Sequence, residues 1–230
     1  MPSQPCPDGP LKGSRLQLRS YMAAYHRQDL DESLLKLLGA AGADYSRLEW
    51  VSPVKSARFA EYRDADFLRQ LGLGHLVDAL RKFWPDNGPC WDALAVAHNP
   101  TLIDSKGVIL LEAKSHRFEM CGCCDATAAD SRRKIEMALS STKTWLRARS
   151  RMKWTSYLYQ YANRLAHLYF LRHIAEPKVD AWLVNLYFTQ DPYRPTSQAQ
   201  WDDFLLEVKW ALGLDNDPPF SLNLFLPAIT

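Results

Sequence analysis

Four consecutive aliphatic residues, 108–111, run directly into the charged residues Glu112 and Lys114. An aliphatic run of this length is typical of a strand that is buried on both faces of a sheet. Such a strand needs covering layers above and below it, so the run favours a fold that layers helices on a sheet. The two charges are unusual at the end of such a strand, because a buried charge costs free energy unless it is paired or coordinated.

The hydrophobic pattern predicts strands and helices in mixed order along the rest of the chain. Strands are predicted at 47–51, 91–97, 107–116, 181–189 and 221–226, and helices at 29–41, 126–149, 155–174 and 197–212, with two short helices within 64–84. The spacing of the second and third strands suits an antiparallel hairpin. We therefore predict an α/β fold, an α/β/α sandwich with a mixed central sheet and added N-terminal helices.

The chain length of 230 residues fits one domain, which we place at 15–230. Residues 1–14 contain four prolines and no apolar run, so we expect a mobile leader rather than a signal peptide. No stretch approaches the roughly 18 apolar residues of a membrane span. These features predict a cytoplasmic protein without a membrane partner, in which the five cysteines stay reduced.

Glu112 and Lys114 project from the same face of the predicted strand, because side chains alternate along a strand. Taken alone, such a pair is most simply an ion pair at a strand end. Asp92 changes this interpretation, since it begins the neighbouring strand and the hairpin can bring its carboxylate to the same end of the sheet. Two carboxylates that share a site repel one another unless a cation lies between them. Hard oxygen ligands of this kind suit Mg²⁺ or Mn²⁺.

Asp92 followed by Glu112-Ala113-Lys114 at the end of an aliphatic strand resembles the PD-(D/E)XK nuclease superfamily, the restriction-endonuclease-like proteins. The wider pattern from Phe83 to Leu94 resembles a group of uncharacterised bacterial members, and the resemblance covers mainly residues 60–190. It implies that Asp92 and Glu112 ligate the metal with help from the Ala113 carbonyl, while Lys114 serves the attacking water. The superfamily often adds an acid from the helix that precedes the hairpin, for which Glu61 is favoured over Asp64 and Asp78. A solvated charge at a helix start is the alternative for each of the three.

The predicted helix 155–174 carries a polar stripe at helical spacing, formed by Gln160, Asn163, Arg164 and His167. A stripe of these residue types is typical either of a solvated face or of a surface that binds phosphates or active-site acids. RecB-type members of the superfamily place a Gln and a Tyr on a comparable helix, so the resemblance implies a catalytic role for Gln160. We assign Asn163 and Arg164 to nucleic-acid binding.

Positive charge is concentrated between Ser131 and Lys153, where eight bases and one acid give +7 in a chain whose net charge is only +2. Such a field can attract a polyanion, although a solvated helix face remains the simpler interpretation. Arg132 and Arg133 are the first candidates for contact with a nucleic-acid backbone. His116 continues the face of Lys114 and is a further candidate, with an exposed strand-end histidine as the alternative.

Cys121, Cys123 and Cys124 form a cluster that lacks the separated pairs of a structural zinc site, and packing at a helix start is favoured. The sequence as a whole predicts a Mg²⁺- or Mn²⁺-dependent nuclease, with DNA favoured over RNA. One alternative is a catalytically idle PD-(D/E)XK fold that serves as a binding module. The other is an unrelated α/β protein in which Glu112 and Lys114 only form an ion pair. A homodimer is left open.

Overall fold

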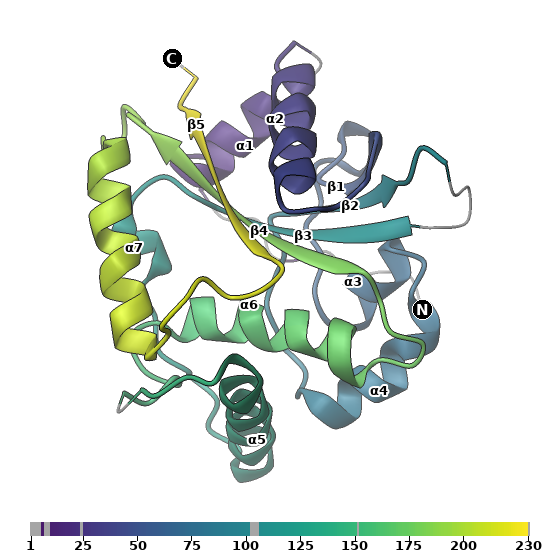
Figure 1. Ribbon diagram of the computed structural model, residues 1–230, viewed down its shortest axis with the longest axis vertical. Coiled ribbons are helices and arrows are strands. Elements are labelled where there is room, and N and C mark those ends of the chain that lie inside the picture. The colour runs from purple at the N-terminus through teal and green to yellow at the C-terminus, as the bar shows by residue number, and fades with distance from the viewer. Residues whose placement is uncertain (1–5, 7–9, 24, 102–105, 151, 230) are drawn as a thin grey trace.

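The computed structural model describes residues 6, 10–23, 25–101, 106–150 and 152–229. At its centre lies a five-stranded sheet in the order β1-β2-β3-β4-β5 (Figure 1). The strands are β1 (Arg47–Ser52), β2 (Ala93–His98), β3 (Lys106–Lys114), β4 (Ala181–Thr189) and β5 (Ser221–Pro227). β1, β2 and β3 pair in antiparallel fashion, whereas β3, β4 and β5 are parallel. The predicted mixed sheet and the predicted β2–β3 hairpin are therefore confirmed.

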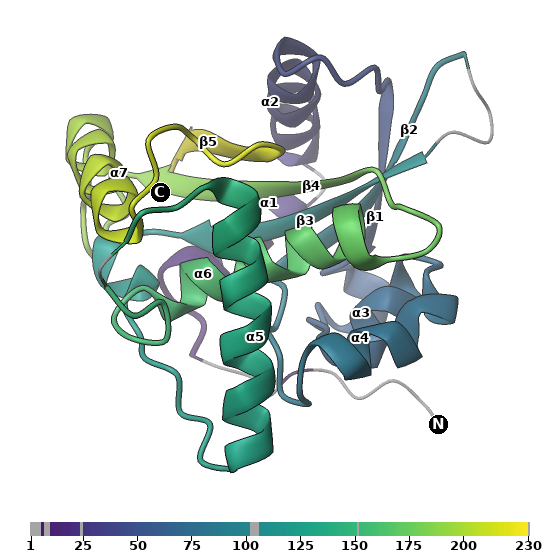
Figure 2. The same ribbon diagram turned by 60° about the horizontal axis from the view of Figure 1, so that its bottom comes forward.

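Helices cover both faces of this sheet (Figure 2). One face carries α1 (Ser14–Met22) and α2 (Arg27–Ala40). The other carries α3 (Asp64–Gln70), α4 (Val77–Phe83), α5 (Ala129–Leu146), α6 (Tyr159–Tyr169) and α7 (Gln198–Leu212). Short 3₁₀ turns lie at Lys55–Ala57, Gly74–Leu76 and Arg117–Met120, and a π-helical turn, Phe170–Ile174, extends α6. The predicted α/β class, with helices flanking a mixed sheet, is confirmed.

The aliphatic run of β3 divides its side chains between two hydrophobic cores. Val108 and Leu110 join the core beneath α6, while Ile109 and Leu111 join the core beneath α1 and α2. All four are buried, and burial of one such side chain stabilises a fold by about 1.5–3 kcal/mol. The run therefore fixes β3 as the central strand, and it holds the residues that follow it at one end of the sheet.

Several predicted boundaries differ from the structure. Asp92 lies in a bend just before β2 rather than inside the strand, and α5 and α6 are shorter than predicted. Residues before α6 pair with the cysteine-containing loop instead, through Gly122 and Cys124. The sequence pattern did not predict α1, which is only 9 residues long and buries four of them.

The expectation of five free thiols is wrong for two of them. Cys6 and Cys90 form a disulfide, with their Cα atoms 6.4 Å apart and thus within the span of this bond. Cys6 belongs to the predicted mobile leader, most of which lies outside the described residues. The bond joins the start of the chain to the loop that leads into Asp92. Among the described residues, no helix has the length and apolar character needed to cross a membrane.

Candidate active site

The end of β3 carries a buried ionic network around Glu112. Lys114 Nζ lies 2.6 Å from Glu112 Oε1, and Arg164 from α6 places Nε and Nη2 each 2.7 Å from Glu112 Oε2. The side chains of Glu112, Lys114 and Arg164 are 8, 13 and 9 % exposed. Both cations meet one carboxylate in a region with little water, where loss of a partner leaves an uncompensated charge.

The guanidinium of Arg164 is used entirely within the protein interior. Besides Glu112, it donates to the backbone carbonyl of Cys90 at 3.0 Å and to Asn163 Oδ1 at 2.8 Å, and it lies over the ring of Trp91. Arg164 and Asn163 were predicted to bind nucleic acid, but in the structure both side chains are buried and approach the site from the protein interior. Arg164 therefore holds Glu112 and the loop before Asp92 in place, and it does not form an exposed phosphate-binding surface.

Asp92 lies in the loop before β2 and contacts the same end of β3. Its Oδ2 accepts a hydrogen bond of 2.8 Å from the backbone N–H of Ala113, the residue between Glu112 and Lys114. The N–H and C=O of one strand residue point to the same side, so the Ala113 carbonyl also faces the Asp92 side of β3. The hairpin thus brings together the two predicted carboxylates and the predicted carbonyl ligand.

Burial and the negative charge of Glu112 raise the pKa of Asp92 to about 8. Burial alone would also raise the pKa of Glu112, but the charges of Arg164 and Lys114 outweigh it and hold that pKa below its usual value. Burial lowers the pKa of Lys114, while Glu112 and Asp92 raise it by more, so its ammonium form is favoured. Near neutral pH the site holds one ionised carboxylate between two cations, beside a second carboxyl that resists ionisation.

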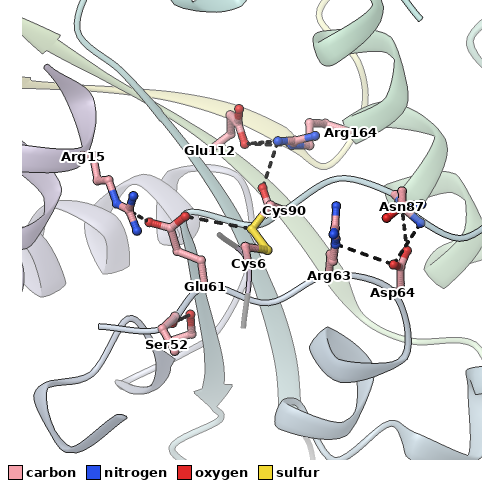
Figure 3. The surroundings of a disulfide bond; sticks show 12 residues. Cys6, Arg15, Ser52, Glu61, Arg63, Asp64, Asn87, Cys90, Glu112 and Arg164 are labelled. Carbon is pink, nitrogen blue, oxygen red and sulfur yellow. Dashed lines mark hydrogen bonds and ion pairs between the residues drawn. A yellow bond between two sulfur atoms is a disulfide. The ribbon is translucent and has the colours of Figure 1, made fainter. Parts of the chain in front are cut away.

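Glu61 lies next to Asp92, although it precedes α3 rather than lying on a helix. An isolated antiparallel bridge pairs Tyr62 with Trp91, which places Glu61 opposite Asp92, and the charge of Glu61 contributes to the raised pKa of Asp92. Figure 3 shows Glu61 between Arg15 of α1, whose Nε is 3.2 Å away, and the Cys6–Cys90 disulfide.

The other two upstream acids lie elsewhere. Asp64 accepts hydrogen bonds from the backbone N–H groups of Asn87 and Gly88, and it thereby ties the start of α3 to the turn before the site. Asp78 is exposed on α4 beside Arg81. Of the three candidates, only Glu61 contributes to the electrostatics of Asp92.

Strand β4 adds two polar residues that the sequence analysis did not select. The parallel register sets Asn185 beside Glu112 and Tyr187 beside Lys114. Both side chains line a small cavity of about 10 Å³, together with Gln160, Tyr161 and the ionic network. The Tyr187 hydroxyl is buried and has no hydrogen-bond partner among the described residues. A cavity of this size has room for about one water molecule.

His167, the remaining residue of the polar stripe, is packed in the hydrophobic core. Its ring is 1 % exposed, packs among Trp84, Phe67 and Trp91, and donates a hydrogen bond from Nδ1 to the backbone carbonyl of Asn163. Burial lowers its pKa to about 3. The polar stripe of α6 is thus neither solvated nor uniform, because Gln160 and Arg164 line the site while His167 fills the core.

The predicted nucleic-acid contacts outside α6 lie on two separate surfaces. His116 is 9 % exposed at the end of β3, close to Glu119 and to the rings of Phe118 and Tyr193. Arg132 and Arg133 are exposed on α5, and Arg132 lines a groove of about 540 Å³ together with Lys143 and Lys153.

The three remaining cysteines are free thiols, of which Cys123 is exposed and Cys121 and Cys124 are partly buried. Their loop packs on the start of α6, where a Cβ on Gly122 would lie 3.2 Å from Gln160 Nε2. Within the part of the chain that the structure describes, no three His, Cys, Asp or Glu side chains are grouped so as to hold a metal ion.

Comparison with known proteins does not assign this chain to a family. No protein-family model, no curated protein and no solved structure matches it.

Proposed function

We propose that this protein is a Mg²⁺- or Mn²⁺-dependent nuclease with a restriction-endonuclease-like fold, acting on nucleic acid with DNA favoured over RNA. The observation that carries the proposal is the hydrogen bond from Ala113 N–H to Asp92, which joins the second carboxylate to the strand end that presents Glu112 and Lys114. An isolated ion pair has no need of a second acid whose pKa burial and a neighbouring carboxylate raise to about 8. A divalent cation would relieve this repulsion.

The donor set fits a hard divalent cation. Asp92, Glu112 and the Ala113 carbonyl supply oxygen ligands, and Mg²⁺ commonly binds through one or two carboxylates while it retains several waters. The absence of a three-residue cluster within the described residues is compatible with this mode of binding. When bound, the cation would act as a Lewis acid toward the phosphate oxygens.

The protein's own side chains would serve the phosphodiester during hydrolysis. A water oxygen forms a bond to phosphorus, the bond to the leaving oxygen breaks, and negative charge builds on the phosphoryl oxygens between these events. The attacking water releases a proton to solvent, and the leaving oxygen takes up a proton from solvent. The favoured ammonium form of Lys114 is suited to stabilise that charge and is less suited to act as a base. Arg164 would position Glu112 through its paired contacts.

A catalytically idle binding module is the second candidate, and one feature favours it. Glu112 is already satisfied by Lys114 and Arg164, so a metal must compete with both cations for this carboxylate. An idle module would bind nucleic acid without turnover and without Mn²⁺ binding at Asp92. Metal titration and cleavage assays therefore distinguish the two candidates.

The test uses labelled single-stranded and duplex DNA and RNA with Mg²⁺ or Mn²⁺, and Mn²⁺ titration calorimetry. We expect wild type to cleave at least one substrate, and Glu112→Gln to lose both Mn²⁺ binding and cleavage. Lys114→Met should keep Mn²⁺ affinity within a few-fold but lower the cleavage rate by about 10² or more, the scale for losing an electrostatic stabiliser.

Lys106→Met is the matched control, because Lys106 is exposed at the opposite end of the same strand. It should leave binding and cleavage unchanged. Wild-type protein that binds no Mn²⁺ and cleaves no substrate would refute the nuclease proposal.

A further inference from the structure

Three aromatic rings form a row beside the carboxyl end of β3, outside the ionic network. His116 lies between Phe118 and Tyr193, with ring centroids 6.2 and 6.0 Å apart. His116 follows Lys114 by two residues, whereas Tyr193 lies in the loop after β4. Because β3 and β4 are parallel, the loops that follow them leave the sheet at the same end, the carboxyl end of the two strands.

The two outer rings are open to solvent. Phe118 is 55 % exposed and Tyr193 is 45 % exposed, although large aromatic side chains are usually covered. His116 is largely buried between them, and its Nδ1 has no hydrogen-bond partner in the structure. The row therefore exposes part of two aromatic rings to a ligand, while the unsatisfied Nδ1 of His116 is itself buried.

Positive groups surround this ring row. The guanidinium of Arg117 lies 5.1 Å from the Phe118 ring centroid, and that of Arg194 lies 5.7 Å from both outer rings. Lys12 Nζ lies 4.8 Å above the Tyr193 ring. Exposed aromatic faces combined with nearby cations are the features with which proteins bind single-stranded nucleic acid, through base stacking and phosphate contacts.

A groove of about 370 Å³ is lined by His116, Phe118, Arg117 and Arg194. Tyr193 does not line this groove but lies beside it, next to His116 and Arg194. Asp203 and Glu207 of α7 also line the groove. Glu119 lies beneath the row, where its carboxylate accepts from the Ser115 and Ser14 backbone N–H groups. The two acids of α7 disfavour phosphates on the α7 side of the groove, so a bound strand would run along the arginine side.

We propose that this groove and the adjoining Tyr193 ring bind a single-stranded segment of nucleic acid, with one base stacked on Phe118 in the groove, another on Tyr193 beside it, and phosphates near Arg117 and Arg194. The inference rests on the proposed nuclease function and specifies its substrate class as a single strand or a frayed end. A continuous duplex keeps its base faces stacked against one another, so it has none to offer these rings.

The test measures fluorescence anisotropy of labelled dT12 and of a blunt 12-base-pair duplex, using wild-type protein in EDTA to prevent metal-dependent cleavage. We expect dT12 to bind at least about tenfold more tightly than the duplex. The double substitution Phe118→Ala with Tyr193→Ala should weaken dT12 binding by about tenfold or more, the scale for removing stacked aromatic side chains, and change duplex binding less than about twofold.

The control is the double substitution Tyr25→Ala with Trp210→Ala, which removes two aromatic residues that are 88 and 85 % exposed elsewhere. It should leave dT12 binding unchanged. Equal affinity for dT12 and duplex, or unchanged dT12 binding after loss of the Phe118 and Tyr193 rings, would overturn the inference. The absence of any nucleic-acid binding, as expected for a protein-docking groove, would also overturn it.

The two proposals fail in different ways. If wild type cleaves no nucleic acid with any metal but the anisotropy pattern holds, the nuclease proposal is wrong and the single-strand groove stands. If wild type cleaves duplex as efficiently as dT12 and the groove variant retains full affinity, the groove inference is wrong and the nuclease proposal stands.

Discussion

Tyr187 is a buried residue at the site whose hydroxyl bonds no other group among the described residues. It lies beside Lys114 in the β3–β4 register. Burial raises its pKa well above the usual value, so the hydroxyl stays protonated and can donate a hydrogen bond. A water in the adjacent cavity would connect this hydroxyl to the ionic network and would position Lys114.

We predict that Tyr187→Phe changes stability by less than about 1 kcal/mol, because the hydroxyl that it removes bonds no protein group among the described residues. The same change should lower kcat by about tenfold and leave KM nearly constant. Tyr161→Phe is the control, since Tyr161 lines the same cavity but bonds to Ser221. Urea unfolding and cleavage kinetics test both variants, and an unchanged kcat for Tyr187→Phe would exclude the positioning role.

The part of the site formed by the hairpin could be predicted because it depends on local rules. Alternation along β3 sets Glu112 and Lys114 on one face, and a short hairpin returns Asp92 to them. Tyr187 and Asn185 lie on β4, which follows β3 after a crossover of more than 60 residues. The pattern of neighbouring residues does not predict the register in which these two parallel strands pair. Asn185 did carry a usable signal, as a polar residue inside the apolar run 181–189.

At the scale of elements, α6 shows why a periodic polar stripe was ambiguous. Helical spacing correctly placed Gln160 and Arg164 on one side, but the sequence does not reveal that this side faces the interior. Burial of nearly the whole helix follows from its place between the sheet and α5 (Figure 2). Arg164 was therefore predicted as a surface contact, although it acts inside the network.

Helix α5 carries the second element-scale prediction. Its exposed Arg132 and Arg133 stand at the start of the most basic segment, on a surface separate from the ring row. If they contact a nucleic-acid backbone, the double change Arg132→Ala with Arg133→Ala should reduce the salt slope of binding by about two units, one per lost phosphate contact.

The measurement is nucleic-acid affinity over a series of salt concentrations, with Lys36→Ala and Arg47→Ala as a control that removes the same charge from exposed positions outside α5. An equal slope in wild type and in the α5 variant would assign these arginines to a solvated helix face.

At the scale of the whole molecule, stability should depend on the protonation of His167. Its pKa is about 3 in the folded protein and about 6.5 in an unfolded chain, so the unfolded state takes up a proton first as the pH falls. The stabilisation is present above about pH 6.5 and is lost progressively toward pH 3.

We predict that wild type loses about 2 kcal/mol more unfolding free energy between pH 7.5 and pH 5 than His167→Gln does. Urea unfolding at the two pH values measures this difference. His75→Gln, at an exposed position, controls for the loss of an imidazole. Identical pH dependence in wild type and His167→Gln would show that His167 is not buried as a neutral ring.

The two-sided core was the most predictable property of the molecule, because one aliphatic run on β3 already required cover on both faces. Helix α1 was not predicted, since its 9 residues carry only a weak pattern and its packing depends on the C-terminal strand. The hydroxyl of Tyr21 on α1 donates to the Pro227 carbonyl, across almost the whole chain length. Neighbouring residues in the sequence do not predict contacts between such distant segments.

The Cys6–Cys90 bond has a practical consequence for biochemistry on this protein. Arg164 donates a hydrogen bond to the backbone carbonyl of Cys90 (Figure 3). The backbone N–H of Cys6 donates to the Glu61 carbonyl. A buffer with dithiothreitol and one without it thus yield two chemically different samples, which differ beside the acids rather than at a remote surface. Thiol content should be titrated for every purified batch, since otherwise two laboratories could assay the same sequence and compare unlike molecules.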